Sequence, residues 1–299
     1  MPTLKFSAAD NLQGSLFMLL AMASFAVGDA ILKHVSGHLP LSQILVTRGV
    51  FATVLLFLIA SYMGQLRSPK IILSIPFIVR LVAEVLATVF FLTALFNMPF
   101  ANASAIMQAL PLTVSLGAAY FFGELIGWRR IIAISVGFVG VLLIVQPGLE
   151  GFNVYSLYCL IAVCCTTTRD LATRKLAKDI PSLFVSLVSV AVVVVLGLFL
   201  SLFQPWQPAA ASDYAALAIA SVFLITAFFG IISAMRIGEV GVVTPFRYSV
   251  LLFAVIIGFF FFEEIPDFLT VTGSIIVVLS GLYTLYRERI SATPDTAEQ

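Results

Sequence analysis

Charged side chains are scarce in this sequence, and their scarcity excludes an ordinary soluble domain. Only 10% of the 299 residues are Asp, Glu, Lys or Arg, whereas about a quarter of the residues of a soluble protein are charged. Hydrophobic residues make up 61% of the chain, and its mean hydropathy is +1.11. The formal net charge is only +1. We therefore expect the surface to meet a lipid bilayer and no nucleic acid.

Motifs that carry catalysis or bind metals are also missing. The sequence contains no HExxH zinc motif, no GxSxG nucleophile motif and no GxxxxGK[ST] phosphate-binding loop. The cysteines Cys159, Cys164 and Cys165 lack the spacing of a metal site, and His34 and His38 fall in one short loop. We expect no metal, no cofactor and no enzyme activity. The alternative class is a membrane-embedded enzyme, which would need a nucleophile with a base or a carboxylate pair.

Long apolar runs are what the chain does contain. A helix needs about 20 apolar residues to cross the hydrocarbon layer of a bilayer. Continuous runs such as VAVVVVLGLFLSLF favour such helices over the alternating strands of a membrane barrel. We therefore predict an all-α integral membrane protein with ten transmembrane helices. The predicted spans are 14–33, 41–62, 74–96, 100–122, 128–146, 153–175, 182–203, 212–234, 240–262 and 266–286.

The basic residues of the loops fall on one side of these predicted spans. If the loops alternate between two sides, Arg67, Arg129, Lys175 and the other basic loop residues share the side of both termini, and only Lys33 lies opposite. Cytoplasmic loops carry the excess of Lys and Arg. We expect a multi-pass protein of the cell inner (plasma) membrane with both termini in the cytoplasm.

The two halves of the sequence resemble each other at a shift of about 140 residues. The aligned pairs include Asp29 with Asp170, Lys33 with Arg174, Pro40 with Pro181, and Glu124 with Glu264. Because each half holds five predicted spans, an odd number, the second half must enter the membrane from the opposite side. Inverted repeats of this kind are typical of secondary transporters, whose solute site lies near the bilayer midplane. We predict two inverted five-helix repeats, over 1–147 and 148–290, and a disordered cytoplasmic tail over 291–299.

This pattern resembles the EamA-like branch of the drug/metabolite transporter superfamily. The resemblance is carried by VTRGVF around Arg48, by FFGELIGWRRIIAISVGFVGVLLI, and by its echo FFEEIPDFLTVTGSIIVVLSGLYTL, in which Glu263 replaces the glycine. It covers nearly the whole chain. It implies a fold of two EamA-like repeats and a carrier whose partner is a small-molecule solute. Since the two halves can pack against each other within one chain, we expect a monomer or a homodimer.

Charged residues inside the predicted spans are the first candidate site residues. A charge near the bilayer centre costs about 2.5–3.5 kcal/mol and usually has a partner inside the bundle. We expect Arg48, Glu84 and Arg247 to line the cavity and to bind polar parts of the solute. The alternative is a structural role, in which pairs such as Arg80 and Glu84 hold helices in register.

The two matched charged couples lie near opposite mouths of the predicted bundle. Asp29 and Lys33 fall at the outer end of the first span, and Asp170 and Arg174 fall at the inner end of the sixth. An acid and a base four residues apart on a helix can neutralise each other, so a structural role is again the alternative. We expect each couple to join a gate on its own side, because alternating access exchanges such contacts between states.

Prolines interrupt the fourth and ninth predicted spans, at Pro111 and Pro245. Interrupted helices at matching places in two halves indicate a transporter site, although kinked helices also occur for packing reasons alone. The further binding residues that we expect are Phe25, Gln108, Tyr158, Thr244 and Tyr248. Aromatic faces beside arginine and amide groups favour a planar heterocyclic solute such as riboflavin or an adenosyl compound, which carriers of the resembled family move. An amino-acid or drug exporter of the same fold is the alternative.

Overall fold

The structure is a computed structural model that describes residues 7–123, 127–147, 153–177, 180–238 and 240–292 of the chain. Within these residues every regular element is a helix, in agreement with the prediction of an all-α protein. The last helix continues to Ala292, so the remainder of the predicted disordered tail lies outside the described residues.

Twelve α-helices and two short 3₁₀ helices make up the described part of the chain. Their bounds are α1 Ala8–Val35, α2 Leu41–Tyr62, η1 Pro69–Leu73, α3 Ile75–Asn97, α4 Phe100–Met107, α5 Leu110–Phe122, α6 Trp128–Val145, α7 Tyr155–Arg174, α8 Ser182–Leu200, α9 Ala211–Ile237, α10 Val240–Val243, η2 Thr244–Tyr248, α11 Ser249–Phe262 and α12 Phe268–Ala292. Each of the ten predicted spans falls on one of these helices or on a consecutive set of them.

Eight helical segments of the described residues are long and apolar enough to cross a membrane. The two predicted spans outside this set fall on α6 and α7. In α6 the apolar stretch is short, from Ile131 to Val145. In α7 the C-terminal half carries the polar run from Thr166 to Asp170, which lowers the hydropathy of this helix. Of the polar residues of α7, Arg169, Asp170 and Thr173 line an internal cavity, which is described below.

Prolines mark both helix ends and helix interruptions. Pro40, Pro99 and Pro181 directly precede α2, α4 and α8, where the missing N–H of proline costs no hydrogen bond. The break between α4 and α5 falls just before Pro111, in the first turn of α5. The second break is the 3₁₀ helix η2, which contains Pro245. The structure thus places interruptions where the sequence predicted them.

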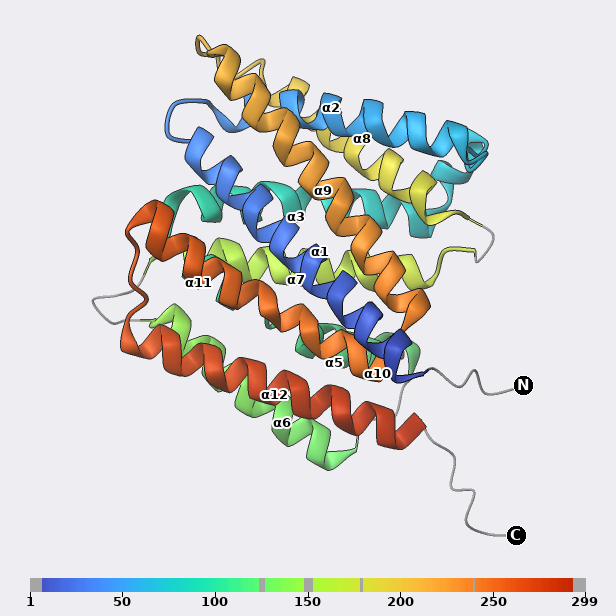
Figure 1. Cartoon of the computed structure of the whole chain (residues 1–299), viewed down its shortest axis with the longest axis vertical. Coiled ribbons are helices and arrows are strands. Elements are labelled where there is room, and N and C mark those ends of the chain that lie inside the picture. The colour runs from blue at the N-terminus through green and yellow to red at the C-terminus, as the bar shows by residue number, and fades with distance from the viewer. Residues whose placement is uncertain (1–6, 124–126, 148–152, 178–179, 239, 293–299) are drawn as a thin grey trace.

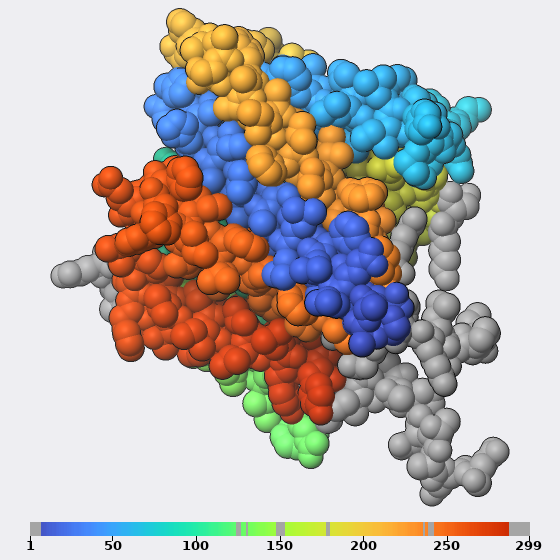
Figure 2. Space-filling view, in the orientation of Figure 1, coloured from blue at the N-terminus to red at the C-terminus, as the bar shows by residue number. Residues whose placement is uncertain are grey.

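The helices pack in pairs across the bundle (Figure 1). The most extensive contacts join α1 with α9, α3 with α7, α6 with α12, and α2 with α8. Figure 2 shows α1 directly against α9 and α11 across one face of the molecule. The start of α1 and the end of α12 lie at the same end of the bundle (Figure 1). We call this the terminal end, and we call the opposite end, where α1 finishes and α12 begins, the far end.

The pair α6–α12 is joined by a seam in which the two backbones nearly touch. A Cβ atom added to Gly140 would lie 2.8 Å from the carbonyl oxygen of Gly273, and one added to Gly273 would lie 2.5 Å from that of Gly140. Only glycine leaves room for this approach. Ser280 donates a hydrogen bond to the carbonyl oxygen of Ala133 across the same seam.

Apolar side chains cover the outside of the bundle as well as its interior. Buried residues such as Leu32, Ile44 and Leu95 form the main core cluster. At the same time Phe260 and Phe261 of α11 are 72% and 78% exposed. Large exposed apolar surfaces are rare on soluble monomers and suit contact with lipid, so the molecule is a multi-pass membrane protein.

Candidate functional site

A cavity of about 290 Å³ lies inside the bundle, between α2, α3, α7, α8 and α9. Five charged residues line it: Arg48 from α2, Arg80 and Glu84 from α3, and Arg169 and Asp170 from α7. We call this cavity the chamber. The structure therefore brings Arg48 and Glu84, which the sequence predicted as binding residues, to one site together with the predicted gating residue Asp170.

Glu84 and Asp170 neutralise two of the three arginines of the chamber. Arg169 pairs with Asp170, with an Nη2–Oδ1 distance of 2.9 Å, and its Nη1 lies 3.4 Å from Oε1 of Glu84. The guanidinium of Arg80 approaches the other oxygen of Glu84 at 3.8 Å. Buried charges are stable only when they are paired and hydrogen-bonded, and this network satisfies that condition for four charged groups from two helices.

Hydroxyl groups complete the surroundings of Arg80. Its Nε donates a hydrogen bond to Oγ1 of Thr173 at 2.9 Å, and its Nη1 bonds to the hydroxyl of Ser189 on α8. Arg80 therefore ties α3 to both α7 and α8. The sequence analysis did not select these hydroxyl residues. A usable signal existed, because Ser186 and Ser189 stand three residues apart in the apolar helix α8, on one face of it, and both line the chamber.

Arg48 differs from the other two arginines of the chamber. Its guanidinium has no hydrogen-bond or ion-pair partner among the described residues, and its Nε is shielded from solvent with no acceptor. Two contacts fix its place in the helix: the carbonyl of Arg48 accepts a hydrogen bond from Ser221 of α9 at 2.9 Å, and the adjacent Gly49 allows a close approach to Val194 of α8. The backbone at Arg48 is thus fixed by neighbouring helices, whereas its guanidinium contacts no carboxylate among the described residues.

Asp29 of α1 is the carboxylate that acts on Arg48. The two side chains interact electrostatically, but they form no ion pair within 4 Å, and Asp29 accepts no hydrogen bond from the described part of the chain. Near Asp29, Phe25 of α1 meets Phe228 of α9 edge to face, with ring centroids 5.9 Å apart. Phe228 belongs to the chamber wall, so Phe25 contacts a residue of that wall without lining the chamber itself.

The remaining predicted binding residues do not line the chamber. Gln108 is buried at the end of α4, and its amide donates to the carbonyl of Ser104 at 3.3 Å. Tyr158 stacks edge to face on Phe90 of α3. Thr244 lies 4.0 Å from the sulfur of Met235.

Tyr248 and Arg247, which are neighbours in η2, have different surroundings. The ring of Tyr248 is buried over Gly281 of α12, and its hydroxyl has no hydrogen-bond partner among the described residues. The side chain of Arg247 is exposed, yet it lies within electrostatic reach of Asp170 and Arg169. Arg247 thus interacts electrostatically with the charge network but is not among the residues that line the chamber.

An ion pair links α1 to the segment between α11 and α12 at the far end of the bundle. Nζ of Lys33 lies 2.7 Å from Oε1 of Glu264 and donates a second bond to the carbonyl of Met98 at 2.5 Å. The other oxygen of Glu264 accepts a bond from the backbone N–H of Phe100, also at 2.5 Å. Lys33 in addition lies over the ring of Phe262, 5.1 Å from its centroid. We call Lys33, Glu264 and the two backbone groups the far-end gate.

These contacts change the predicted partners within the gating couples. Lys33 binds Glu264 and not Asp29, four residues before it on the same helix. Asp170 binds its neighbour Arg169. Arg174 is exposed at the end of α7. For Lys33 the physical reason is reach, because Glu264 on a distant segment offers a shorter contact than the i, i+4 position on the same helix surface. This reason does not apply to Asp170, whose partner Arg169 is the preceding residue of α7.

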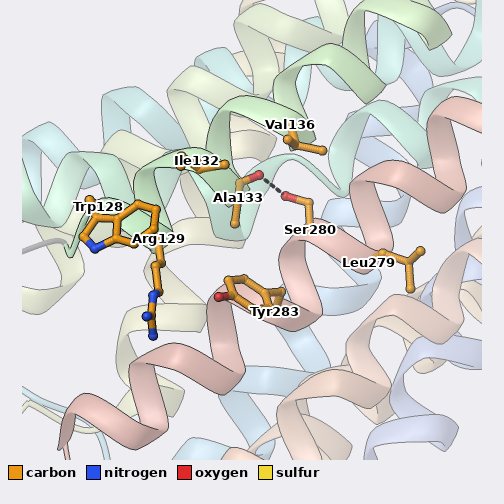
Figure 3. Close-up of a pocket in the computed structure, with 8 residues that line it drawn as sticks. All are labelled: Trp128, Arg129, Ile132, Ala133, Val136, Leu279, Ser280 and Tyr283. Atoms are coloured by element: carbon orange, nitrogen blue, oxygen red, sulfur yellow. Dashed lines mark hydrogen bonds between the residues drawn. The ribbon is translucent and has the colours of Figure 1, made fainter.

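A second, larger hollow of about 440 Å³ lies on the outer surface between α6 and α12, near the terminal end (Figure 3). Trp128 and Ile132 of α6 and Leu279 of α12 line it, and these side chains are 53–66% exposed. Figure 3 shows the bond from Ser280 to Ala133 at its floor. This groove is open and apolar and faces where lipid would lie, so its size does not make it the solute site.

A model of the EamA-like transporter family matches the chain twice, over residues 12–146 and 153–286. The chain belongs to the EamA-like transporter family. The two matched segments follow one another without overlap. The drug/metabolite transporter resemblance drawn from the sequence is therefore confirmed.

Relatives of this EamA-like protein match it along nearly its full length. The S-adenosylmethionine uptake transporter of Rickettsia prowazekii is 25% identical over 94% of this chain and 95% of its own. The pseudopaline exporter CntI of Pseudomonas aeruginosa is 27% identical over 89% and 94%. The riboflavin transporter of Vibrio cholerae is 26% identical over 90% and 91%.

The fold of this EamA-like chain also has a counterpart among solved structures. A crystal structure of another protein superposes with a TM-score of 0.64, covers 93% of this chain and 99% of that one, and is 18% identical. At that identity the likeness concerns the fold alone.

Proposed function

We propose that the protein is a secondary transporter that moves a small organic metabolite across the plasma membrane by alternating access through the chamber. The observation that carries this proposal is the chamber itself. It holds five charged residues inside a bundle of apolar helices. Charged side chains are costly to place there, and those that occur usually pair with one another or mark the path of a solute or ion. Membership of a transporter family and relatives named as carriers of small metabolites support the same class of function.

The proposed architecture is ten spans in two inverted five-helix repeats. In this reading α1, α2, α3, α4–α5 and α6 correspond to α7, α8, α9, α10–α11 and α12. The helix contacts support it, because exchanging the two halves leaves the pattern of packing unchanged. The pair α1–α9 becomes α7–α3, the pair α1–α11 becomes α7 with α4 and α5, and the pairs α2–α8 and α6–α12 become themselves, and all of these contacts occur.

The chamber then lies where the halves meet, as it does in other transporters with inverted repeats. Its wall takes α2 and α3 from the first repeat and α7, α8 and α9 from the second. The far-end gate also joins the halves, because Lys33 belongs to the first repeat and Glu264 to the second. Rocking of one half against the other would break this gate and open the chamber toward the far end. We propose that this end faces the outside of the cell, because the Lys and Arg residues of the loops are predicted to gather on the other side.

The solute that we propose is a planar heterocyclic metabolite, riboflavin-like or adenosyl-like, with a polar part that faces the charged wall. The apolar residues Phe228 and Leu224 of α9 offer the chamber's flat apolar side. Relatives are named for S-adenosylmethionine and for riboflavin. The alternative is an exporter of an amino-acid-like or drug-like solute, which the relative named as a pseudopaline exporter favours. The chamber is complete within one chain, so a monomer suffices for transport.

Counterflow into proteoliposomes tests the proposal. Vesicles that contain the purified protein are preloaded with unlabelled S-adenosylmethionine, riboflavin or an amino-acid mixture, and uptake of the labelled solute is followed. A carrier accumulates its labelled solute transiently and releases it chemically unchanged, whereas a membrane-embedded enzyme would convert it without accumulation. The matched control is the variant Glu84→Gln with Asp170→Asn, which leaves the arginines of the chamber unpaired and should abolish accumulation. Equal accumulation in vesicles with and without protein would reject the transporter.

A further inference from the structure

The groove between α6 and α12, which we call the outer groove, is apolar along most of its length and basic at one end. Ile132, Ala133 and Val136 of α6 and Leu279 of α12 supply the apolar part. Arg129 is the one charged residue among those that line the groove. Because each helical residue rises about 1.5 Å, Arg129 lies about 10 Å along α6 from Val136.

The charge of Arg129 is available to a ligand. Its side chain is exposed and takes part in no ion pair or hydrogen bond within the described part of the chain. The guanidinium lies over the ring of Trp128, 5.3 Å from its centroid, a distance at which an aromatic ring attracts a cation. In Figure 3 the hydroxyl of Tyr283, from α12, points toward the side chain of Arg129. The basic end of the groove therefore combines a cation, an indole ring and a phenol hydroxyl.

This basic end lies where the bundle meets the membrane interface. The two helices run antiparallel, because Gly140 meets Gly273 while Ala133 meets Ser280. Trp128 and Arg129 begin α6, and the end of α12 lies at the terminal end of the bundle. Tryptophan and tyrosine concentrate at membrane interfaces. The groove thus has the polarity of a lipid molecule, with charge at the interface and apolar surface toward the bilayer centre.

The floor of the groove keeps an occupant on the outside of the bundle. Ser280 donates a hydrogen bond to the carbonyl oxygen of Ala133 there, and further along the seam the backbones of Gly140 and Gly273 leave no room for even a Cβ atom. A ligand must therefore lie along the surface between the two helices. An acyl chain has this shape.

We propose that the outer groove binds an anionic phospholipid, with the lipid phosphate on Arg129 and the hydroxyl of Tyr283. An acyl chain of the lipid lies against Ile132, Val136 and Leu279. Basic pockets between transmembrane helices on the cytoplasmic side are known to hold lipid head groups. The site goes beyond the proposed function, because it lies outside the bundle and shares no lining residue with the chamber.

Quenching of Trp128 fluorescence by brominated lipid tests the site. The chain has two tryptophans, so Trp206→Phe leaves Trp128 as the single fluorescent indole. The purified full-length protein is reconstituted in phosphatidylcholine vesicles. A rising fraction of this lipid is then replaced by phosphatidylglycerol or phosphatidylcholine that carries bromine on the acyl chain near the glycerol. Bromine quenches a fluorophore that it contacts, so the fraction at half-maximal quenching reports the relative affinity of each lipid.

We expect phosphatidylglycerol to reach half-maximal quenching at an about fivefold lower fraction than phosphatidylcholine. This preference corresponds to the attraction of about 1 kcal/mol between one basic residue and anionic lipid. Arg129→Gln should make the two lipids equal, and its melting temperature should stay normal because the side chain is exposed.

Two controls separate the groove from the general charge of the protein. Arg67→Gln removes another exposed arginine from the same side of the membrane, and the lipid preference at Trp128 should survive it. Trp128→Phe leaves Trp206, which lies in the segment between α8 and α9, and this indole should show no preference. Soluble glycerol phosphate, which has the head-group charge without the chain, should not reverse the quenching of Trp128.

Equal quenching of Trp128 by both lipids would overturn the inference, and so would a preference that survives Arg129→Gln. Equal losses in Arg129→Gln and Arg67→Gln, or the same preference at Trp206, would assign the effect to the overall field and reject the site. Reversal by glycerol phosphate would indicate a site for free phosphate in place of a lipid. Because no solute is transported in this assay, its outcome does not depend on the proposed function.

Discussion

Replacing Glu264 by Gln should open the far end of the transporter. The substitution removes the ion pair with Lys33, whose Nζ lies 2.7 Å from the carboxylate. It also removes the negative charge of the group that accepts a hydrogen bond from the backbone N–H of Phe100. The side chains of Lys33 and Glu264 are only 12% and 20% exposed, so solvent screens this pair less than a surface pair. Loss of one charged hydrogen bond costs about 1.5–3 kcal/mol. If the cost falls on the far-end-closed state alone, the open-to-closed ratio rises by about 10- to 100-fold.

Cysteine accessibility measures this ratio. The three native cysteines are replaced by alanine, and Thr88→Cys is introduced on the chamber wall. A membrane-impermeant thiol reagent is applied from the far-end side. If opening and closing are fast compared with labelling, the labelling rate follows the open population, and Glu264→Gln should raise it by about the same 10- to 100-fold.

Glu263→Gln provides the matched control. It removes the same charge from the adjacent residue, whose side chain is exposed and takes no part in the far-end gate. Labelling of Thr88→Cys should be unchanged in this variant. Equal acceleration in both variants would mean that the general field of the far end matters and the specific gate does not, and no acceleration in either would refute the gate.

Three further predictions concern the seam, the charge network and η2. Gly140→Leu should force α6 and α12 apart and destabilise the protein by about 1–3 kcal/mol, which would lower its melting temperature in detergent. The control Gly127→Ala, whose Cβ meets open space, should leave the melting temperature unchanged. Equal melting temperatures for the two variants would show that the seam does not stabilise the protein. Arg80→Gln should cost about 3–5 kcal/mol because it strips partners from a buried network, and an unshifted denaturation midpoint would contradict this. Tyr248→Phe should preserve both stability and uptake, because the buried hydroxyl has no described partner; a loss of uptake with a normal melting temperature would return Tyr248 to the solute path.

The all-helical membrane fold and two residues of the candidate chamber, Arg48 and Glu84, could be predicted from the sequence. Continuous apolar runs define membrane helices because the bilayer fixes their length. Charges inside such runs are informative because each is expensive to insert. This is why Arg48 and Glu84 could be selected from their positions inside apolar runs, and the structure places both on the wall of the chamber. The same logic marked Pro111 and Pro245, where the helices are interrupted.

The ion-pair partner of Lys33 and the helix face on which Tyr248 lies could not be predicted from the sequence, for physical reasons. Lys33 and Glu264 are 231 residues apart, and nothing local in the sequence selects Glu264 over Asp29. Tyr248 is the last residue of the 3₁₀ helix η2, and a 3₁₀ helix has 3.0 residues per turn where an α-helix has 3.6. Each such residue rotates the following side chains relative to an uninterrupted helix. A face assigned to Tyr248 by α-helical counting therefore need not be the one observed.

The glycine seam between α6 and α12 has a consequence for motion. It joins the final helix of each proposed repeat at a separation set by main-chain atoms, which cannot change rotamer to accommodate sliding. Relative tilting of the repeats would thus pivot about this line, with displacement growing with distance from it. The helices that carry Lys33, Arg48 and Arg80 lie away from the pivot. A small rotation about the seam would therefore displace these helices by a larger distance and change how far the chamber is open.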